Sequence, residues 1–320
     1  SDYTNILELV QKVSARFGQR NLNVSLPSLR IDSFSIQLMD ELKELRPGGG
    51  FTLAPEAATE KMRRIINKFV DHDQILKTVR EIYAHGWTSV KLYFMIGHPL
   101  ETIEDVQAIA DLCRAVLAEG RRIVGGRAKV HAGVSTFIPK PHTPFQWVSC
   151  DTVDMIQQKQ DLLKRELRDR NIKLTWTEPE STLLEAWLSR GDRRLGAVIL
   201  RAWELGARFD AWQDQYRYDA WLQAFADAGL DHEFYSHRER SLDEIHPWSS
   251  ISTGVRASYL KQDYQWSREE RFRADCREHC FACGILPGFN DLRRPLADDA
   301  WKCPPVKTQP SAETATEPAA

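Results

Sequence analysis

Three cysteines near the end of the chain carry the clearest chemical signal in this sequence. Cys276, Cys280 and Cys283 follow one another as C-x3-C-x2-C within DCREHCFACG. Thiolates at this spacing can hold three irons of a [4Fe–4S] cluster and leave the fourth iron for another ligand. Cys303 follows twenty residues later and is the candidate fourth protein ligand. The four cysteines are therefore predicted to form a metal site.

Two metals fit these cysteines. One is an iron–sulfur cluster, with Cys303 or a group from outside the protein on the fourth iron. The other is a structural Zn²⁺ ion, with His279 or Cys303 completing four ligands. We favour the cluster, because no fourth protein ligand stands at zinc-finger spacing.

Carboxylates and glycines follow the predicted strands in the first half of the chain. Glu56 comes just after one strand, and Gly97 and Glu101 come just after the next. In parallel α/β folds, the loops at the carboxyl ends of the strands build the site. A carboxylate there could hold an amine or a ribose hydroxyl. The plainer explanation is a tight turn with a carboxylate before a helix N-terminus, and on spacing alone it is favoured.

The elements that must position these residues alternate between strand and helix. The predicted strands are 22–26, 51–54, 89–96 and 130–138. The predicted helices are 34–45, 57–67, 73–85, which stops at Gly86, and a helix that opens on the capping box 102–105 and stops at Gly120. This alternation predicts a parallel sheet with right-handed crossovers.

After Pro139 the pattern changes. A long charged helix is predicted over 151–170, a short strand over 172–176, and helices rich in Trp and Tyr over 181–229. Residues 230–275 read as irregular. We expect a barrel part over 1–148, a mainly α-helical extension over 149–275, a cysteine-rich segment over 276–303 and a disordered tail over 304–320.

Composition limits the class of protein. The 320 residues are 42% hydrophobic and 28% charged, as in ordinary globular proteins, and the net charge of −2 gives no basic footprint for nucleic acid. Six cysteines, three of them clustered, fit a reducing compartment, and no apolar run approaches a membrane span, so we expect a cytoplasmic protein. The chain opens on Ser1 and enters a helical pattern at once, so we expect that the N-terminal part of a longer protein is missing.

Several long segments resemble the radical S-adenosylmethionine (SAM) superfamily. The segments are SLPSLRIDSF (25–34), FTLAPEAATEKMRRIINK (51–68), VKLYFMIGHPLETIED (90–105), VSTFIPKPHTPFQW (134–147), SRGDRRLGAVILRAWELGARFDAW (189–212) and DCREHCFACG (275–284). The likeness is greatest to uncharacterised bacterial members that carry an N-terminal cobalamin-binding-like domain. It extends to about residue 288.

The resemblance implies a six-unit partial (β/α) barrel of the TIM type. The four predicted strands would be its last four units, followed by the helical extension. The first two units, which carry the catalytic cluster loop, are absent from this sequence. His98 stands where the family has an apolar residue. The residues that the resemblance places around SAM are Ser28, Arg30, Glu56, Lys91, Gly97 and Glu101.

The activity that the resemblance implies is reductive cleavage of SAM to a 5′-deoxyadenosyl radical, on an unknown substrate. The late cysteines would then hold an auxiliary [4Fe–4S] cluster, because no strand precedes Cys276 and no β/α pattern follows Cys283, as a catalytic cluster loop requires. A flavodoxin or ferredoxin would supply electrons, and cobalamin is a further candidate cofactor of the intact protein. This chain alone is expected to be inactive. The alternative is a non-catalytic iron–sulfur or zinc protein that serves as a scaffold or electron carrier.

Overall fold

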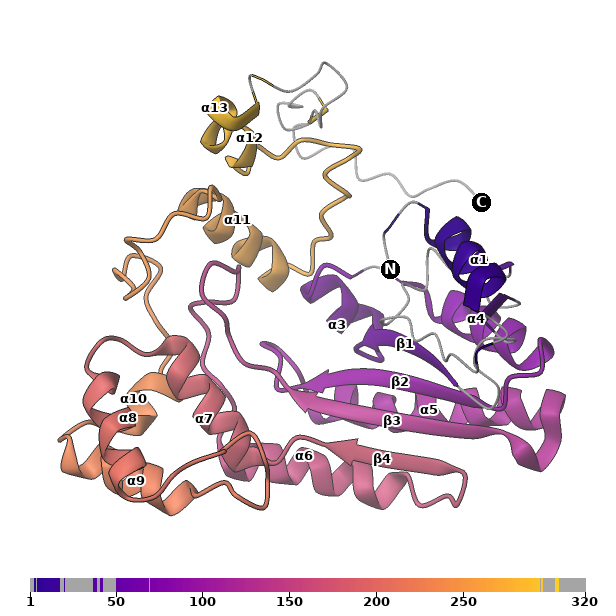
Figure 1. The fold of residues 1–320 in the computed structure, drawn as a ribbon, viewed down its shortest axis with the longest axis horizontal. Coiled ribbons are helices and arrows are strands. Elements are labelled where there is room, and N and C mark those ends of the chain that lie inside the picture. Colours follow the sequence, from indigo (N-terminus) through magenta and orange to yellow (C-terminus); the bar gives the residue numbers. More distant parts are fainter. Residues whose placement is uncertain are drawn as a thin grey trace.

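Four parallel strands form one open sheet in the order β1-β2-β3-β4 (Figure 1). The computed structural model describes residues 3, 5–17, 20, 37–38, 41–42, 50–68, 70–293, 295 and 303–304. The strands are β1 (Phe51–Glu56), β2 (Ser89–Ile96), β3 (Lys129–Thr136) and β4 (Ile172–Trp176). They alternate with helices, so the predicted partial α/β barrel is confirmed. The helices between the strands are α3 (Glu60–Ile65), α4 (His72–Ala84), α5 (Ile103–Val124) and α6 (Val153–Glu166).

The main core lies between the sheet and its helices. Leu92 and Ile96 of β2 are fully buried, and they share one apolar cluster with Ile75 of α4, Val106 of α5 and Ile156 of α6. The helix α1 (Ile6–Phe17) adds its buried face to the same cluster. The opposite, concave face of the sheet carries polar side chains, because residues alternate between the two faces along a strand.

Most helix boundaries follow their predicted signals. Helix α4 begins after Asp71, whose side chain accepts from the Asp73 N–H, and it ends before Gly86, which has a φ of +86°. Helix α5 begins with the predicted capping box of Thr102 and Asp105.

The predicted stop of that helix at Gly120 was wrong. The helix runs on to Val124, and Gly125 caps it with a φ of +65°. At Gly120 a Cβ atom would lie 2.6 Å from the ring of Tyr83, so this glycine lets α4 and α5 pack closely and does not end a helix.

The sheet continues past residue 148, where we expected the barrel part to end. Strand β4 pairs in parallel with β3, with Ile172 opposite Val130 in the core, and α6 packs on α5. The described sheet therefore gains its fourth strand on the β3 side. The predicted strand 22–26 lies outside the described residues, as does most of the predicted helix 34–45.

A helical region follows the sheet, as predicted. It contains α7 (Pro179–Arg190), α8 (Leu195–Glu204), α9 (Tyr218–Asp227) and α10 (His232–Ser236), which pack around the fully buried Trp187. Each helix in the described parts of the chain is too short or too polar to cross a membrane.

Two helices, α10 and the later α11, lie where irregular chain was expected over 230–275. Helix α11 (Ala257–Arg268) buries Leu260 and Tyr264, which are four residues apart, against Trp147 and Phe137. Two buried apolar side chains in twelve residues make a weak periodic signal, so sequence reasoning missed this helix. The short helices α12 (Ile285–Gly288) and α13 (Asn290–Arg293) end the described C-terminal part, and residues 305–320 lie outside it.

Candidate functional site

A cavity of about 510 Å³ opens at the carboxyl ends of β1, β2 and β3. Parallel α/β sheets bind their ligands at this edge. Polar and aromatic side chains from the strand ends, the loops after them and α7 line it. They include Glu56, Lys68, Met95, His98, Ser135, Thr136, Phe137, Lys140, Phe145, Thr182 and Glu185.

Glu56 lines this cavity from the last position of β1. Its backbone lies in the left-handed region, with a φ of +64°, which few residues other than glycine adopt. Its carboxylate pairs with the ammonium of Lys68 at 2.9 Å. The predicted carboxylate is therefore at the cavity, and a cation already balances its charge.

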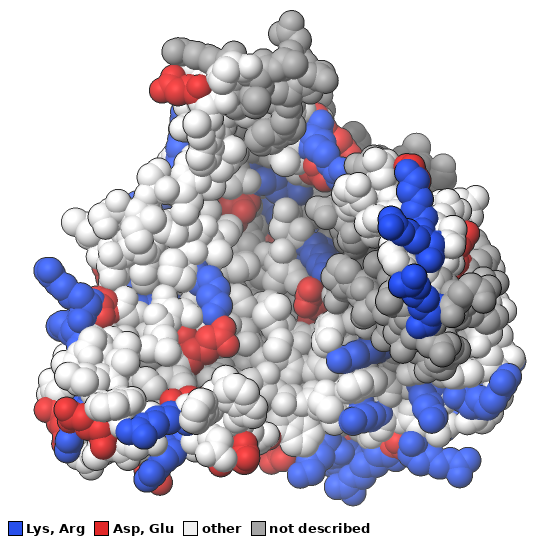
Figure 2. Space-filling view, in the orientation of Figure 1, with Lys and Arg blue, Asp and Glu red and all other residues white. Residues whose placement is uncertain are grey.

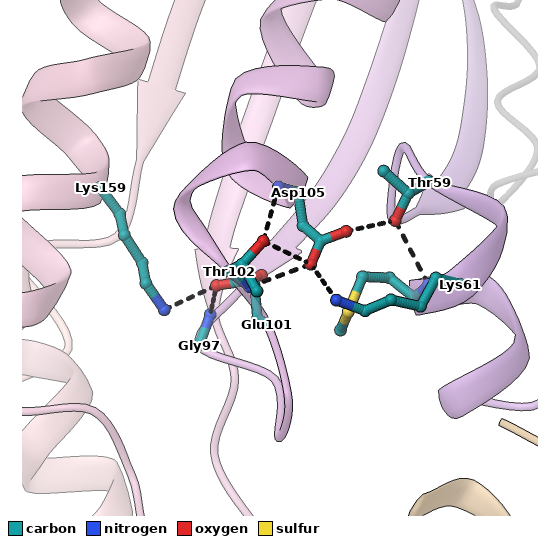
Figure 3. A network of polar contacts seen from close by, with 8 residues as sticks. Thr59, Lys61, Gly97, Glu101, Thr102, Asp105 and Lys159 are labelled. Carbon is teal, nitrogen blue, oxygen red and sulfur yellow. Dashed lines mark hydrogen bonds and ion pairs between the residues drawn. The ribbon is translucent and has the colours of Figure 1, made fainter. Parts of the chain in front are cut away.

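The turn after β2 is built around Gly97 and Glu101. Gly97 has a φ of +87°, and a Cβ atom there would lie 3.0 Å from Asp151 Oδ2, so only glycine fits without strain. The Gly97 N–H donates to Glu101 Oε2 at 2.7 Å (Figure 3). Lys159 of α6 donates to the same carboxylate and to Asp151, both at 2.6 Å.

Glu101 therefore acts as an anchor of this turn. Its side chain is 3% exposed and both of its bonds are internal. Burial raises the pKa of Glu101, while the Lys159 charge and the Gly97 N–H oppose that rise. Lys159 keeps its proton, because the two carboxylates raise its pKa despite burial. The geometry agrees with the plainer of the two explanations of Glu101, and its contact with SAM stays a prediction.

A second carboxylate joins the helices on either side of β2. Asp105 accepts from Thr59 Oγ1 at 2.7 Å, from Lys61 Nζ at 2.6 Å and from the Thr102 N–H at 3.0 Å (Figure 3). Burial would raise the pKa of Asp105, but these donors, Lys61 foremost, lower it. Asp105 thus fixes the start of α3 to the start of α5, beside the loops that form the cavity.

His98 is the residue that sequence reasoning left out of the site. It lies at the cavity, is 6% exposed, and neither ring nitrogen has a hydrogen-bond partner among the described residues. Burial, and next the charge of Lys159, lower the pKa of His98 to about 4, so its imidazole is neutral near pH 7. The hydroxyl of Thr136, also buried at the cavity, has no partner there either. The only sequence signal for His98 was that it stands where the radical SAM family has an apolar residue.

Comparison with known proteins identifies the N-terminal part. Residues 1–113 match the radical SAM superfamily. The match covers this part of the chain and not residues 114–320. An uncharacterised protein of Methanocaldococcus jannaschii is 31% identical over 198 residues, which are 62% of this chain and 41% of that relative. The chain thus spans about two fifths of the length of the curated relative that it matches.

The other predicted SAM-pocket residues have different outcomes. Lys91 of the radical SAM domain lies on the concave face of β2, and its ammonium stands 4.6 Å from the centre of the Tyr93 ring. It does not line the cavity. Ser28 and Arg30 lie outside the described residues.

The four late cysteines gather at the C-terminal end of the described chain. Burial raises the pKa of the Cys303 thiol, and the nearby Cys280, Cys283 and Cys276 raise it further. Cys276 is exposed and the other three are partly exposed. In the described part of the chain, no three metal-ligating side chains are close enough together to hold an ion. Four thiols in one neighbourhood are nevertheless the donor set that a [4Fe–4S] cluster or Zn²⁺ takes.

Arg273 ties the cysteine-rich segment to the radical SAM domain. Its backbone N–H donates to Asn67 Oδ1, just after α3, at 2.7 Å. Its guanidinium lies 4.2–4.7 Å from the ring centres of Tyr259, Trp266 and Phe281. Stacking of an arginine on an aromatic ring is worth about 2 kcal/mol or more when desolvated. The residue three positions before Cys276 is therefore fixed against the loop whose Lys68 holds Glu56.

Proposed function

We propose that the protein to which this chain belongs is a radical SAM iron–sulfur enzyme. Its reaction is the reductive cleavage of SAM to a 5′-deoxyadenosyl radical, which abstracts hydrogen from a substrate. The observation that carries the proposal is the radical SAM domain, whose described strands end at a polar and aromatic cavity. A bound [4Fe–4S] cluster supplies the electron for this chemistry.

The chain's own residues supply binding and shape. Glu56 accepts a hydrogen bond from a hydroxyl or amine of SAM. This bond partly replaces its ion pair with Lys68. The Gly97 backbone lets the ligand approach the strand end, and Glu101 with Lys159 keeps that turn in place. Phe137 and Phe145, which meet edge to face at 5.6 Å, shield the cavity from water.

The catalytic cluster needs thiolates that this sequence does not offer at the sheet. Before residue 276 the sequence has only Cys113 and Cys150, and both are buried. Burial raises the pKa of Cys113 to about 12 and that of Cys150 to about 11, which disfavours the thiolate that binds iron. We infer that the ligands of the catalytic cluster come from outside this sequence, and that this chain alone does not cleave SAM.

The late cysteines form a separate metal site in this proposal. Cys276, Cys280, Cys283 and Cys303 hold an auxiliary [4Fe–4S] cluster, supported by their common neighbourhood and by the anchoring of the segment through Arg273. The alternative is a non-catalytic iron–sulfur or zinc protein that serves as a scaffold or electron carrier.

The remaining assignments follow from the proposed reaction. A flavodoxin or ferredoxin delivers the electrons, in the reducing compartment of the cytoplasm. Cobalamin as a further cofactor of the intact protein rests on the resemblance of the segments quoted above.

Anaerobic reconstitution of this chain tests the metal site. About four irons per chain, lost in Cys280→Ala and kept in the matched Cys150→Ala control, are expected from an auxiliary cluster. The electron paramagnetic resonance signal of the reduced cluster should not shift when SAM is added. A shift would make these cysteines the catalytic site, and zinc without iron would overturn the cluster.

Assay of 5′-deoxyadenosine tests the reaction itself. The intact protein with SAM and reductant should produce it, and this chain alone should not. Production by this chain alone would contradict the inference that the catalytic ligands lie elsewhere.

A further inference from the structure

Three basic side chains form a row across the concave face of the sheet. Lys91 of β2 lies opposite His131 of β3, and His131 lies opposite Lys173 of β4. Thr52 of β1 lies opposite Lys91, so these register partners cross all four strands. Register partners in a sheet point to the same face and lie about 4.8 Å apart from strand to strand. We call Lys91, His131 and Lys173 the basic row.

The row lies on the face that the helices leave open. In Figure 1 the sheet lies in front of α5, and Figure 2 shows Lys and Arg side chains over this part of the molecule, below a hollow. Tyr93, the next concave residue of β2, is 37% exposed, and Lys173 is exposed. A ligand can therefore reach the row from the open side of the partial barrel.

Packing holds two members of the row in place. The His131 Nε2 atom is 2.9 Å from Thr175 Oγ1 on the neighbouring strand. The ammonium of Lys91 lies 4.6 Å from the centre of the Tyr93 ring. That ring lies over Gly133, where a Cβ atom would come within 3.1 Å of it. Gly133 thus makes room for the ring that positions Lys91.

No described carboxylate balances the charge of the row. Among the described residues, neither Lys91 nor Lys173 forms an ion pair, whereas Lys61 and Lys159 each bind a carboxylate. The described concave positions of the four strands carry one carboxylate, that of Glu56, which is paired with Lys68. Burial, and then the charges of Lys91 and Lys173, lower the pKa of His131.

We propose that the basic row binds an anionic group of the substrate, a carboxylate or a phosphate. This inference rests on the proposed function and deepens it: the enzyme acts on an acidic small molecule. Lys91 and Lys173 bind the anion, and His131 donates or accepts a hydrogen bond beside it.

The position of the row also sets the reach of the substrate. Met95 and Ser135 line the cavity four residues along the strands from Lys91 and His131. Four residues of a strand span about 13 Å at about 3.3 Å per residue. The substrate therefore extends about 13 Å from its anionic group to the reacting end at the cavity.

Anion binding by this chain tests the proposal without SAM, iron or turnover. Titration calorimetry with pyrophosphate and with succinate, at ionic strength held constant with NaCl, should show binding to the wild-type chain. Lys91→Gln and Lys173→Gln should each weaken the preferred anion about tenfold, which is about 1.4 kcal/mol. Lys91→Arg should keep most of the affinity, since the charge is retained. Tighter binding of pyrophosphate would indicate that the anionic group of the substrate is a phosphate. Tighter binding of succinate would indicate a carboxylate.

The control is Lys164→Gln, an exposed lysine on α6. It should bind both anions like the wild type. Absence of binding above the NaCl background, or equal losses in Lys164→Gln and Lys91→Gln, would overturn the basic row as a site. Because no SAM is present, either result leaves the test of the proposed reaction untouched, and a failure of SAM cleavage would leave anion binding standing.

Discussion

Leu92 and Ile96 of β2 are fully buried in a core shared by three crossover helices, whereas Cys276 at the other end of the chain is exposed. The helices differ as well: α5 has 22 residues, and α12 and α13 have four each. The sheet is held by apolar packing and by ion pairs such as that of Lys159 with Glu101. The cysteine-rich segment is held by a few contacts around Arg273.

This difference separates two ways of building a site. The turns around the cavity get their shape from the folded sheet, so they are in place before any ligand arrives. The described late cysteines have little apolar packing around them, so in the proposed metal site the bound metal would supply most of the local stability.

The largest effect is expected for Lys159→Met. The change leaves Glu101 and Asp151 buried without their cation, which typically costs about 3–5 kcal/mol of unfolding free energy. Burial already raises the pKa of Glu101, and loss of the ammonium would raise it further. A raised carboxyl pKa lowers stability as pH rises, so the loss should be greater at pH 8 than at pH 5.

Urea unfolding at these two pH values measures that effect. Lys164→Met, an exposed position on the same helix, is the control and should cost little. Equal, small losses in both variants would mean that the ion pairs do not hold the turn.

A smaller effect is expected from His98 in acid. Its folded pKa of about 4 lies below the ordinary value of 6.5, so its contribution to stability is full above pH 6.5 and is lost as pH falls towards 4. The wild type should lose about 3 kcal/mol from this group by pH 4. In His98→Gln the unfolding free energy should not show this loss between pH 6.5 and pH 4. In His72→Gln, at the start of α4, the loss should remain. An identical pH dependence of the unfolding free energy in the two variants would mean that His98 is more exposed to solvent than the structure shows.

Gly97→Ala should cost about 1–3 kcal/mol, since the new Cβ atom meets Asp151 in a left-handed backbone. Gly126→Ala is the matched control, because nothing lies within 4 Å of its Cβ position. Thermal unfolding compares the two. An unchanged midpoint for Gly97→Ala would show that the turn can relax, and that the sheet edge is less rigid than the core.

The smallest effect on the sheet is expected from removal of the proposed metal from the late cysteines. Chelation, or Cys283→Ser, should change the unfolding free energy of the sheet by less than about 1 kcal/mol, since no described residue of that segment belongs to the main core. Hydrogen exchange should speed up in 274–293 and stay slow in β2 and β3. Faster exchange in the strands would mean that the two regions are one cooperative unit.

The sequence predicted the sheet core well because its signals are local. The apolar run of β2 has the predicted limits 89–96, and the capping box of Thr102 and Asp105 starts α5 as expected. Gly86 ends α4 because a positive φ is a property of the residue itself. Gly120 was wrongly predicted to end the helix. A glycine inside a helix can also allow close packing of a second helix that is distant in sequence.

The features of the candidate site also divide into those that the local sequence predicts and those that depend on tertiary contacts. The residue types and spacing determined the cysteine cluster, the carboxylate after β1 and the glycine after β2, since each signal lies within a few residues of chain. Only the tertiary structure decided that Glu101 is held by Lys159, 58 residues away, that His98 lies unpartnered at the cavity, and that Lys91, His131 and Lys173 form one row. These facts depend on strand register and helix packing, which join residues that no local pattern connects.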